Sequence, residues 1–145
     1  MQIDEFVEKL WILRGVVAGN LGQPHTQLPT PELLRFGHVR GWLEDSDERF
    51  PYTPVDRRAA ARIVHQFMKI ELKIEDLADI SAAEKLKDLY TCRSCAVHVA
   101  QVYCRGLIKC ESDFFNHLEL VSTFEAVQIF KRLRKLLEST DRAEN

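Results

Sequence analysis

Long apolar runs are missing from this 145-residue sequence: the longest covers only residues 10–13 (Leu-Trp-Ile-Leu) and ends at Arg14. A helix that crosses a bilayer needs about 20 apolar residues, so we expect no membrane span. An excess of charge of one sign is missing as well, because 20 Lys and Arg are balanced by 22 Asp and Glu and the net charge is −2. A chain with so little net charge has no long-range field that attracts nucleic acid, and we expect no nucleic-acid partner.

Signals for export and for catalysis are also missing. Residues 1–10 lack the basic start and the apolar block of a secretory signal. This predicts a cytoplasmic protein, or a cell-envelope protein if a signal precedes Met1. No glycine-rich phosphate loop occurs, and the five histidines pair with no obvious Ser or Cys nucleophile in the sequence. We therefore expect a protein without enzymatic activity and without a cofactor.

The sequence does contain helical periodicity. Its length and its hydrophobic content of 46% suit one globular domain. Three segments repeat apolar residues at helical spacing: Ile3, Phe6, Val7, Leu10 and Leu13; Ala60, Ile63, Val64 and Phe67; and Val127, Phe130, Leu133 and Leu137. Each stripe is typical of a helix that buries one face. After the first stripe, Gly19, Gly22 and Pro24 predict a loop. No segment alternates as a strand does, so we expect an all-α domain over 1–137 and a polar tail over 138–145.

The ends of several helices are marked in the sequence. Capping boxes at Ser81–Glu84 and Ser122–Glu125, and Pro54 as a first helical residue, predict three helix starts. Helices over about 31–40 and 94–105 are each followed by a glycine, which commonly ends a helix. The second of these two is apolar on nearly every side, so we expect it to be the central, most buried helix.

A weak internal repeat links the two halves of the chain. Residues 40–43 (Arg-Gly-Trp-Leu) are matched 65 positions later by residues 105–108 (Arg-Gly-Leu-Ile), and Phe50 is matched by Phe115 at the same offset. The two copies cover about 31–70 and 94–137. Two such units, preceded by a lone helix, predict stacked helical hairpins that share one core.

The repeat unit resembles the S-layer homology module. The family pattern begins with Phe-x-Asp-Val, ends a first helix at Gly-Ile/Val, and opens the next helix with Ile-Thr-Arg-Ala-Glu. Residues 77–80 (Leu-Ala-Asp-Ile) resemble the beginning, and residues 106–108 (Gly-Leu-Ile) resemble the helix end. Residues 121–125 (Val-Ser-Thr-Phe-Glu) resemble the opening and keep its Glu, while residues 55–59 (Val-Asp-Arg-Arg-Ala) keep its Arg as Arg57.

Modules of this family commonly bind secondary cell-wall polymers and anchor proteins to the envelope, and the resemblance implies a role of that kind. We therefore predict a non-catalytic interaction module that binds a protein partner through surface loops and helix ends. A cell-wall polymer anchor is the alternative. The resemblance makes Arg57 and Glu125 candidate ligand-binding residues. Trp42 is the third candidate, as a large aromatic anchor beside apolar helical residues.

Cysteine chemistry leaves a third interpretation open. The four cysteines are Cys92, Cys95, Cys104 and Cys110. They are not expected to share one zinc ion, because Cys95 and Cys104 fall on opposite faces of one helix, roughly 13 Å apart along its axis. Cys92, Cys95 and His98 share a face and would suit a small metal-binding site, whereas ordinary buried thiols are the simpler role. A disulfide between Cys104 and Cys110 is expected only in an exported protein.

Two charged segments each have an ordinary and a functional interpretation. Residues 45–50, with Asp56, faintly resemble a calcium loop, but Arg49 and Phe50 stand where an oxygen ligand and a glycine are needed. This favours a solvated acidic loop. The basic run consists of Lys131, Arg132, Arg134 and Lys135. It either complements the dipole of the last helix or faces an acidic surface of a partner.

Overall fold

The computed structural model describes residues 1–19 and 28–144, and helices are its only regular elements over that part of the chain. They are α1 (Ile3–Gly19), α2 (Thr30–Arg40), α3 (Asp45–Arg49), α4 (Arg57–Ile70), the short 3-10 helices η1 (Ser81–Lys85) and η2 (Leu89–Thr91), α5 (Ala96–Cys104) and α6 (Thr123–Glu144). The predicted all-α fold is confirmed. Of the predicted loop, Gly22 and Pro24 lie outside the described residues, and Gly19 is the last residue of α1.

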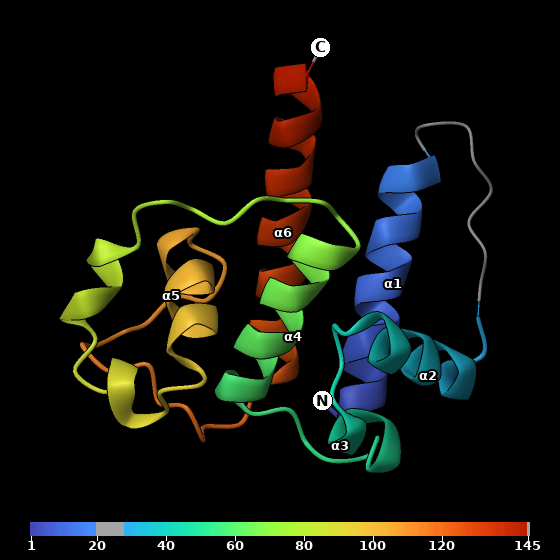
Figure 1. Cartoon of the computed structure of the whole chain (residues 1–145), viewed down its shortest axis with the longest axis horizontal. Helices are drawn as coiled ribbons and strands as arrows, with labels where there is room; N and C mark the ends of the chain where they lie inside the picture. The colour runs from blue at the N-terminus through green and yellow to red at the C-terminus, as the bar shows by residue number, and fades with distance from the viewer. Residues whose placement is uncertain (20–27, 145) are drawn as a thin grey trace.

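The long helices α1, α4 and α6 begin at the same end of the molecule and leave it in broadly the same direction (Figure 1). Backbone hydrogen bonds tie their starts together. The amide of Ile3 donates to the carbonyl of Thr53 (3.0 Å), and the amide of Val55 donates to the carbonyl of Met1 (2.9 Å). The amide of Val121 donates to the carbonyl of Val55 (2.9 Å). The first turns of α4 and α6 are therefore held next to each other, although they are far apart in the sequence.

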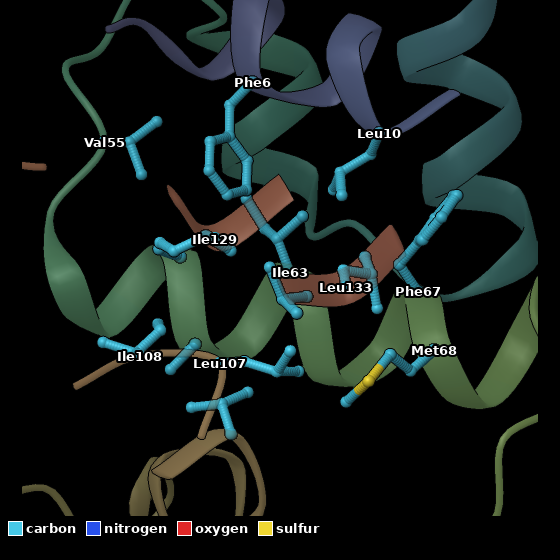
Figure 2. Packing of buried hydrophobic residues seen from close by; sticks show 14 of the residues in the cluster. Phe6, Leu10, Val55, Ile63, Phe67, Met68, Leu107, Ile108, Ile129 and Leu133 are labelled. Carbon is cyan, nitrogen blue, oxygen red and sulfur yellow. The ribbon is translucent and has the colours of Figure 1, made fainter. Parts of the chain in front are cut away.

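One hydrophobic core fills the space between these helices (Figure 2). The residues that converge there come from α1, α4, α6 and the segment after α5, and none exposes more than 1% of its surface: Phe6, Leu10, Ile63, Phe67, Leu107, Ile108, Ile129 and Leu133. Burial of this apolar surface is the main favourable term in folding. The stripes predicted for α1 and α4 are confirmed, because all of their residues are buried.

The stripe predicted for α6 is shifted at its first half. Val127 is exposed and Phe130 is only half-buried, whereas Ala126 and Ile129 are fully buried. Both sets have helical spacing, and Phe130 still packs on Phe6 of α1 with ring centroids 5.1 Å apart. The helix also continues to Glu144, through most of the predicted polar tail. Among the described residues, no helix has both the length and the apolar content that a bilayer crossing requires.

The central helix is α4, and the prediction that the 94–105 helix is central is wrong. Helix α4 packs against α5 on one side and contributes to the shared core with α1 and α6 on the other (Figures 1 and 2). Eight of its 14 residues are buried, including the polar Arg57 and His65. Helix α5 lies at one side, with Val97 52% exposed. Short apolar side chains on every face do not by themselves place a helix at the centre.

The two predicted glycine stops are confirmed and share one local structure. Gly41 has φ of 93° and Gly106 has φ of 73°, a left-handed conformation that favours glycine. After each glycine, the amides of the next two residues donate to a single carbonyl in the last turn, that of Gly37 in one copy and that of Val102 in the other. Both residues after each glycine are buried. The two copies therefore share one local structure at this point, while the repeat as a whole and the stacking of its copies as hairpins stay predictions.

The acidic segment that we expected as a solvated loop forms α3. Its Asp47 caps the helix, because the carboxylate accepts from the amide of Glu44 (2.8 Å). The same carboxylate is buried against Arg62 of α4 in a bidentate pair (2.7 and 3.0 Å). Phe50, which follows α3, is exposed, whereas its repeat counterpart Phe115 is fully buried. The repeat therefore does not extend to this pair.

Two of the three predicted helix starts differ in the structure. Helix α4 begins at Arg57 and not at Pro54, with Asp56 as its N-cap, because the residues before it are held in extended backbone by the other helix starts. The Ser81 capping box opens only a five-residue 3-10 helix. Its hydroxyl donates to the carboxylate of Asp79 (2.6 Å) and does not cap an amide of the next turn.

Candidate ligand-binding site

Two of the three predicted ligand-binding residues, Arg57 and Glu125, meet where α4 and α6 begin. Arg57 is the first residue of α4, and the N-cap Asp56 accepts from the amide of Ala59 (2.7 Å). Glu125 lies in the first turn of α6, and its amide donates to the capping hydroxyl of Ser122 (3.0 Å). Capping determines where each helix begins, and the backbone pairing between the two starts aligns them. As a result, Nη1 of Arg57 donates to Oε1 of Glu125.

The guanidinium of Arg57 also holds the segment 109–115 against these helices. Its Nε donates to the carbonyl of Phe115 (2.7 Å), and its Nη2 donates to the carbonyl of Lys109 (3.0 Å). The sulfur of Cys110 lies 3.7 Å from Nη2, and the guanidinium sits over the ring of Phe115 at 4.9 Å. Arg57 is only 7% exposed. Because its donors are engaged within the protein, Arg57 orders one wall of the site and is a positioning residue.

A cavity of about 880 Å³ opens beside this ion pair, and we call it the α4/α6 cavity. The 109–116 segment forms one wall, and Glu125, Gln128 and Arg132 of α6 contribute to another. Phe114 and Phe124 also line it, and both remain well exposed to solvent. A volume of this size accommodates a small ligand or a few side chains of a larger one.

Burial changes the pKa of two groups in the α4/α6 cavity. It raises the pKa of the Glu125 carboxyl, against the opposing charge of Arg57. It also raises the pKa of the Cys110 thiol, against the charge of the same arginine. A nucleophilic cysteine needs a lowered pKa. Cys110 is therefore a lining group of the cavity and not an activated nucleophile.

Asp88 orders the same wall, and sequence reasoning did not identify it. Its two carboxylate oxygens accept from the amides of Phe115 (2.7 Å) and Asn116 (2.8 Å). Although partial burial alone would raise it, the pKa of Asp88 is lowered by these hydrogen bonds and by the nearby His117. Asn116 has φ of 62°, so this carboxylate supports a left-handed turn. No local pattern marks a side chain whose partners lie 27 and 28 residues away.

Trp42, the third predicted site residue, belongs to the core. It is fully buried, and its ring packs edge-on against Phe67 with centroids 4.9 Å apart. Trp42 does not line the α4/α6 cavity. The exposed aromatic residues at the site are Phe114 and Phe124, and only the structure distinguishes them from core residues.

The three candidate metal ligands lie close together, but each already has another partner in the structure. Cys92 and Cys95 are joined by a disulfide, and the other two cysteines are free thiols. His98 instead meets His65 of α4, with the two Nδ1 atoms 2.7 Å apart. Across the described ranges, no group of three or more His, Cys, Asp or Glu side chains is arranged to hold a metal ion.

Acidification is expected to destabilise the protein through His98. Burial, with the charges of His65 and Arg62, lowers the pKa of His98 from 6.5 to about 4. Between pH 6.5 and pH 4, His98 binds a proton in the unfolded chain but not in the folded protein. The contribution of the neutral ring to stability is therefore complete above pH 6.5 and is lost as the pH falls toward 4. Because the ring is only partly buried and solvent screens it, we expect a loss of about 2 kcal/mol. Urea unfolding at pH 7 and pH 4.5 measures it.

The His98→Gln variant is expected to lose most of this pH dependence, and His38→Gln, a matched change in α2, is expected to keep it. The carboxylates of Asp76 and Asp88 do not add to this change in stability between pH 7 and pH 4.5. Their pKa values are lowered from 3.8, so the stability that they contribute is lost only below that pH. An unchanged slope in His98→Gln would contradict the prediction.

The α4/α6 cavity thus combines a partly buried ion pair, exposed phenyl rings and amide side chains between α6 and a wall that Arg57 and Asp88 hold in place. Such a site recognises a ligand with both apolar and polar groups. Models of protein families, curated proteins and solved structures were compared with the chain, and none matches it. The function is therefore inferred from the geometry of this site.

Proposed function

We propose that the chain is a non-catalytic interaction module that binds a segment of a partner protein at the α4/α6 cavity. The observation that carries this proposal is the exposure of Phe114 and Phe124 at a cavity beside a partly buried ion pair. Phe124, in the first turn of α6, leaves 74% of its surface in water. Exposed aromatic rings beside a cavity are typical anchors of protein interfaces.

The basic side chains along α6 favour a partner segment with carboxylates, while the acidic Glu111 and Glu119 line the cavity outside α6. Arg132 lines the cavity and donates to the carbonyl of Leu107 (3.2 Å), which fixes its side chain. Lys109, which also lines the cavity, is exposed, and so are Lys131 and Lys135 of α6. Complementary charge orients a partner and speeds its association. We therefore expect a segment that places an apolar side chain in the cavity and carboxylates along α6.

A cell-wall polymer is the second candidate ligand, and one observation favours it. Asn116 and Gln128 line the cavity together with Phe124. Planar amides hydrogen-bond sugar hydroxyls, since they both donate and accept, and an aromatic face packs on a sugar ring. The resemblance to S-layer homology modules supports the same ligand class.

Selection of phage-displayed peptides on the immobilised full chain tests the first proposal. We expect acidic peptides with an aromatic or aliphatic anchor, whose affinity falls about tenfold or more in Phe124→Ala. The matched control is Val39→Ala in α2, because Val39 is also 74% exposed but does not line the cavity. Equal affinity for Phe124→Ala and the wild type would refute the proposal. Co-sedimentation with purified wall polymer that Gln128→Ala abolishes would instead select the second candidate.

A further inference from the structure

A second cavity, of about 450 Å³, is lined by residues of α3, the start of α4 and the turn that leads into α5. Both bridged cysteines, Cys92 and Cys95, line it, and so does His98. We call it the disulfide cavity. It shares no lining residue with the α4/α6 cavity, so its chemistry is independent of the proposed function.

The Cys92–Cys95 bridge does little for the fold. A disulfide stabilises a protein more when it closes a longer loop, and this one encloses only Arg93 and Ser94. Both cysteines are partly exposed to solvent. A bridge that contributes little to stability and stays accessible is suited to exchange with other thiols.

A chain of hydrogen bonds leads from a carboxylate to the ring of His98. Oδ1 of Asp76 lies 2.7 Å from Nε2 of the buried His65, whose Nδ1 lies 2.7 Å from Nδ1 of His98. With both rings neutral, His65 donates to Asp76 and accepts from His98, which leaves a lone pair on Nε2 of His98. The other charged groups that act on His98 are Arg62 and Lys69, both on α4.

We propose that Cys92 and Cys95 form a thiol–disulfide exchange site for a small thiol-bearing peptide, with His98 as its base and acid. Nε2 of His98 takes the proton of the substrate thiol while the proton on its Nδ1 passes to Nδ1 of His65, so the positive charge rests beside Asp76 and His98 stays neutral. The substrate sulfur attacks Sγ of Cys92, and the same chain later runs in reverse. The bond between Cys92 and Cys95 breaks, and Cys95 leaves as a thiolate that receives the proton from His98.

A second substrate thiol then completes the reaction. Its sulfur attacks the substrate sulfur of the mixed disulfide, and the Cys92 sulfur leaves and takes up the second proton. The products are one substrate disulfide and the dithiol of Cys92 and Cys95. Two substrate thiols have thus lost two electrons and two protons, and the protein disulfide has gained both pairs.

The positions of the two sulfurs assign their roles. The Cys92 sulfur lies 3.5 Å from the hydroxyl of Ser94 at an exposed site, where an incoming thiol can reach it. Cys95 packs against the core and is the N-cap residue of the nine-residue helix α5. The positive end of a helix dipole stabilises a thiolate, so Cys95 is the better leaving group.

The charges around the disulfide cavity indicate the substrate class. Arg62 is held by Asp47, whereas Arg58 and Glu44 line the cavity with largely exposed side chains whose ion pairs are long, with Asp56 (3.9 Å) and Arg62 (3.6 Å). They offer one positive and one negative partner. A thiol that carries both a carboxylate and an ammonium group, as a short peptide does, matches both.

Glutathione redox buffers test the exchange on the full chain, with alkylation and mass spectrometry as the readout. We expect Cys92 and Cys95 to change together between disulfide and dithiol as the glutathione ratio varies, while the circular dichroism spectrum stays that of the folded protein. In Cys95→Ser, oxidised glutathione is expected to form a mixed disulfide at Cys92 at least tenfold faster than it does at Cys95 in Cys92→Ser. A pair that exchanges only after denaturation, or equal rates in the two variants, overturns the proposal.

His98→Asn separates a proton-transfer role from a structural one. It is expected to slow exchange at neutral pH about tenfold or more, whereas the matched His38→Asn does not. At a pH where the glutathione thiol is fully ionised, the rates of His98→Asn and the wild type are expected to converge, because a thiolate needs no base. An unchanged neutral rate, or a deficit that persists at high pH, overturns the role of His98. β-Mercaptoethanol, at equal thiolate concentration, is expected to react at least tenfold more slowly than glutathione, and equal rates overturn the substrate class.

Discussion

Arg57→Ala is expected to lower the free energy of unfolding by about 3 kcal/mol, because it leaves a partly buried carboxylate without its partner. The substitution also removes the donors to the carbonyls of Lys109 and Phe115, which hold one wall of the α4/α6 cavity. Buried acceptors that lose their donors add to the cost. Urea unfolding followed by circular dichroism measures the change.

Arg58→Ala is the matched control for this variant. Arg58 follows Arg57 in the sequence, is largely exposed, and makes only a 3.9 Å ion pair with Asp56. We expect its loss to change stability by no more than about 0.5 kcal/mol. Equal effects of the two substitutions would show that Arg57 does not order the site.

Trp42→Ala is expected to lower the free energy of unfolding by about 4 kcal/mol, because it leaves a large void in a close-packed core. Trp42 is fully buried and packs on Phe67, and it follows the glycine stop that turns the chain inward after α2. Trp42→Phe is expected to cost less, since it keeps an aromatic ring there. The same unfolding measurement compares the two variants.

Phe124→Ala is the matched control for Trp42, because it removes an aromatic ring that is exposed. We expect it to change stability by less than about 0.5 kcal/mol while it weakens peptide binding. If Trp42→Ala left stability intact and abolished binding, Trp42 would be a ligand contact and the core assignment would be wrong.

Features set by local chemistry were predictable from the sequence. The left-handed stops at Gly41 and Gly106 follow from the residue type, and the Ser122 cap follows from a hydroxyl oxygen three residues before the amide that donates to it. The buried stripes of α1 and α4 follow from spacing, because only one face of each helix is continuously apolar. The resemblance also singled out Arg57 and Glu125, which the fold brings together.

Features set by distant neighbours were not predictable. The start of α4 moves to Arg57 because residues before it pair with the starts of α1 and α6. The contribution of Asp88 to the site, the exposure of Phe124 and the approach of His98 to His65 each depend on where another segment packs. The residues next to these side chains in the sequence therefore do not predict that packing.

By itself, the sequence determined an all-α chain, the glycine stops of two helices, the Ser122 cap and two of the residues of its candidate site. Those features are local, since hydrogen bonds within one turn and the period of the apolar pattern decide them. The tertiary structure alone decided which helix is central, which phenylalanines stay in water and which residues the Cys92–Cys95 bridge faces. Burial and pairing between segments are properties of the assembled fold, because they depend on which surfaces meet.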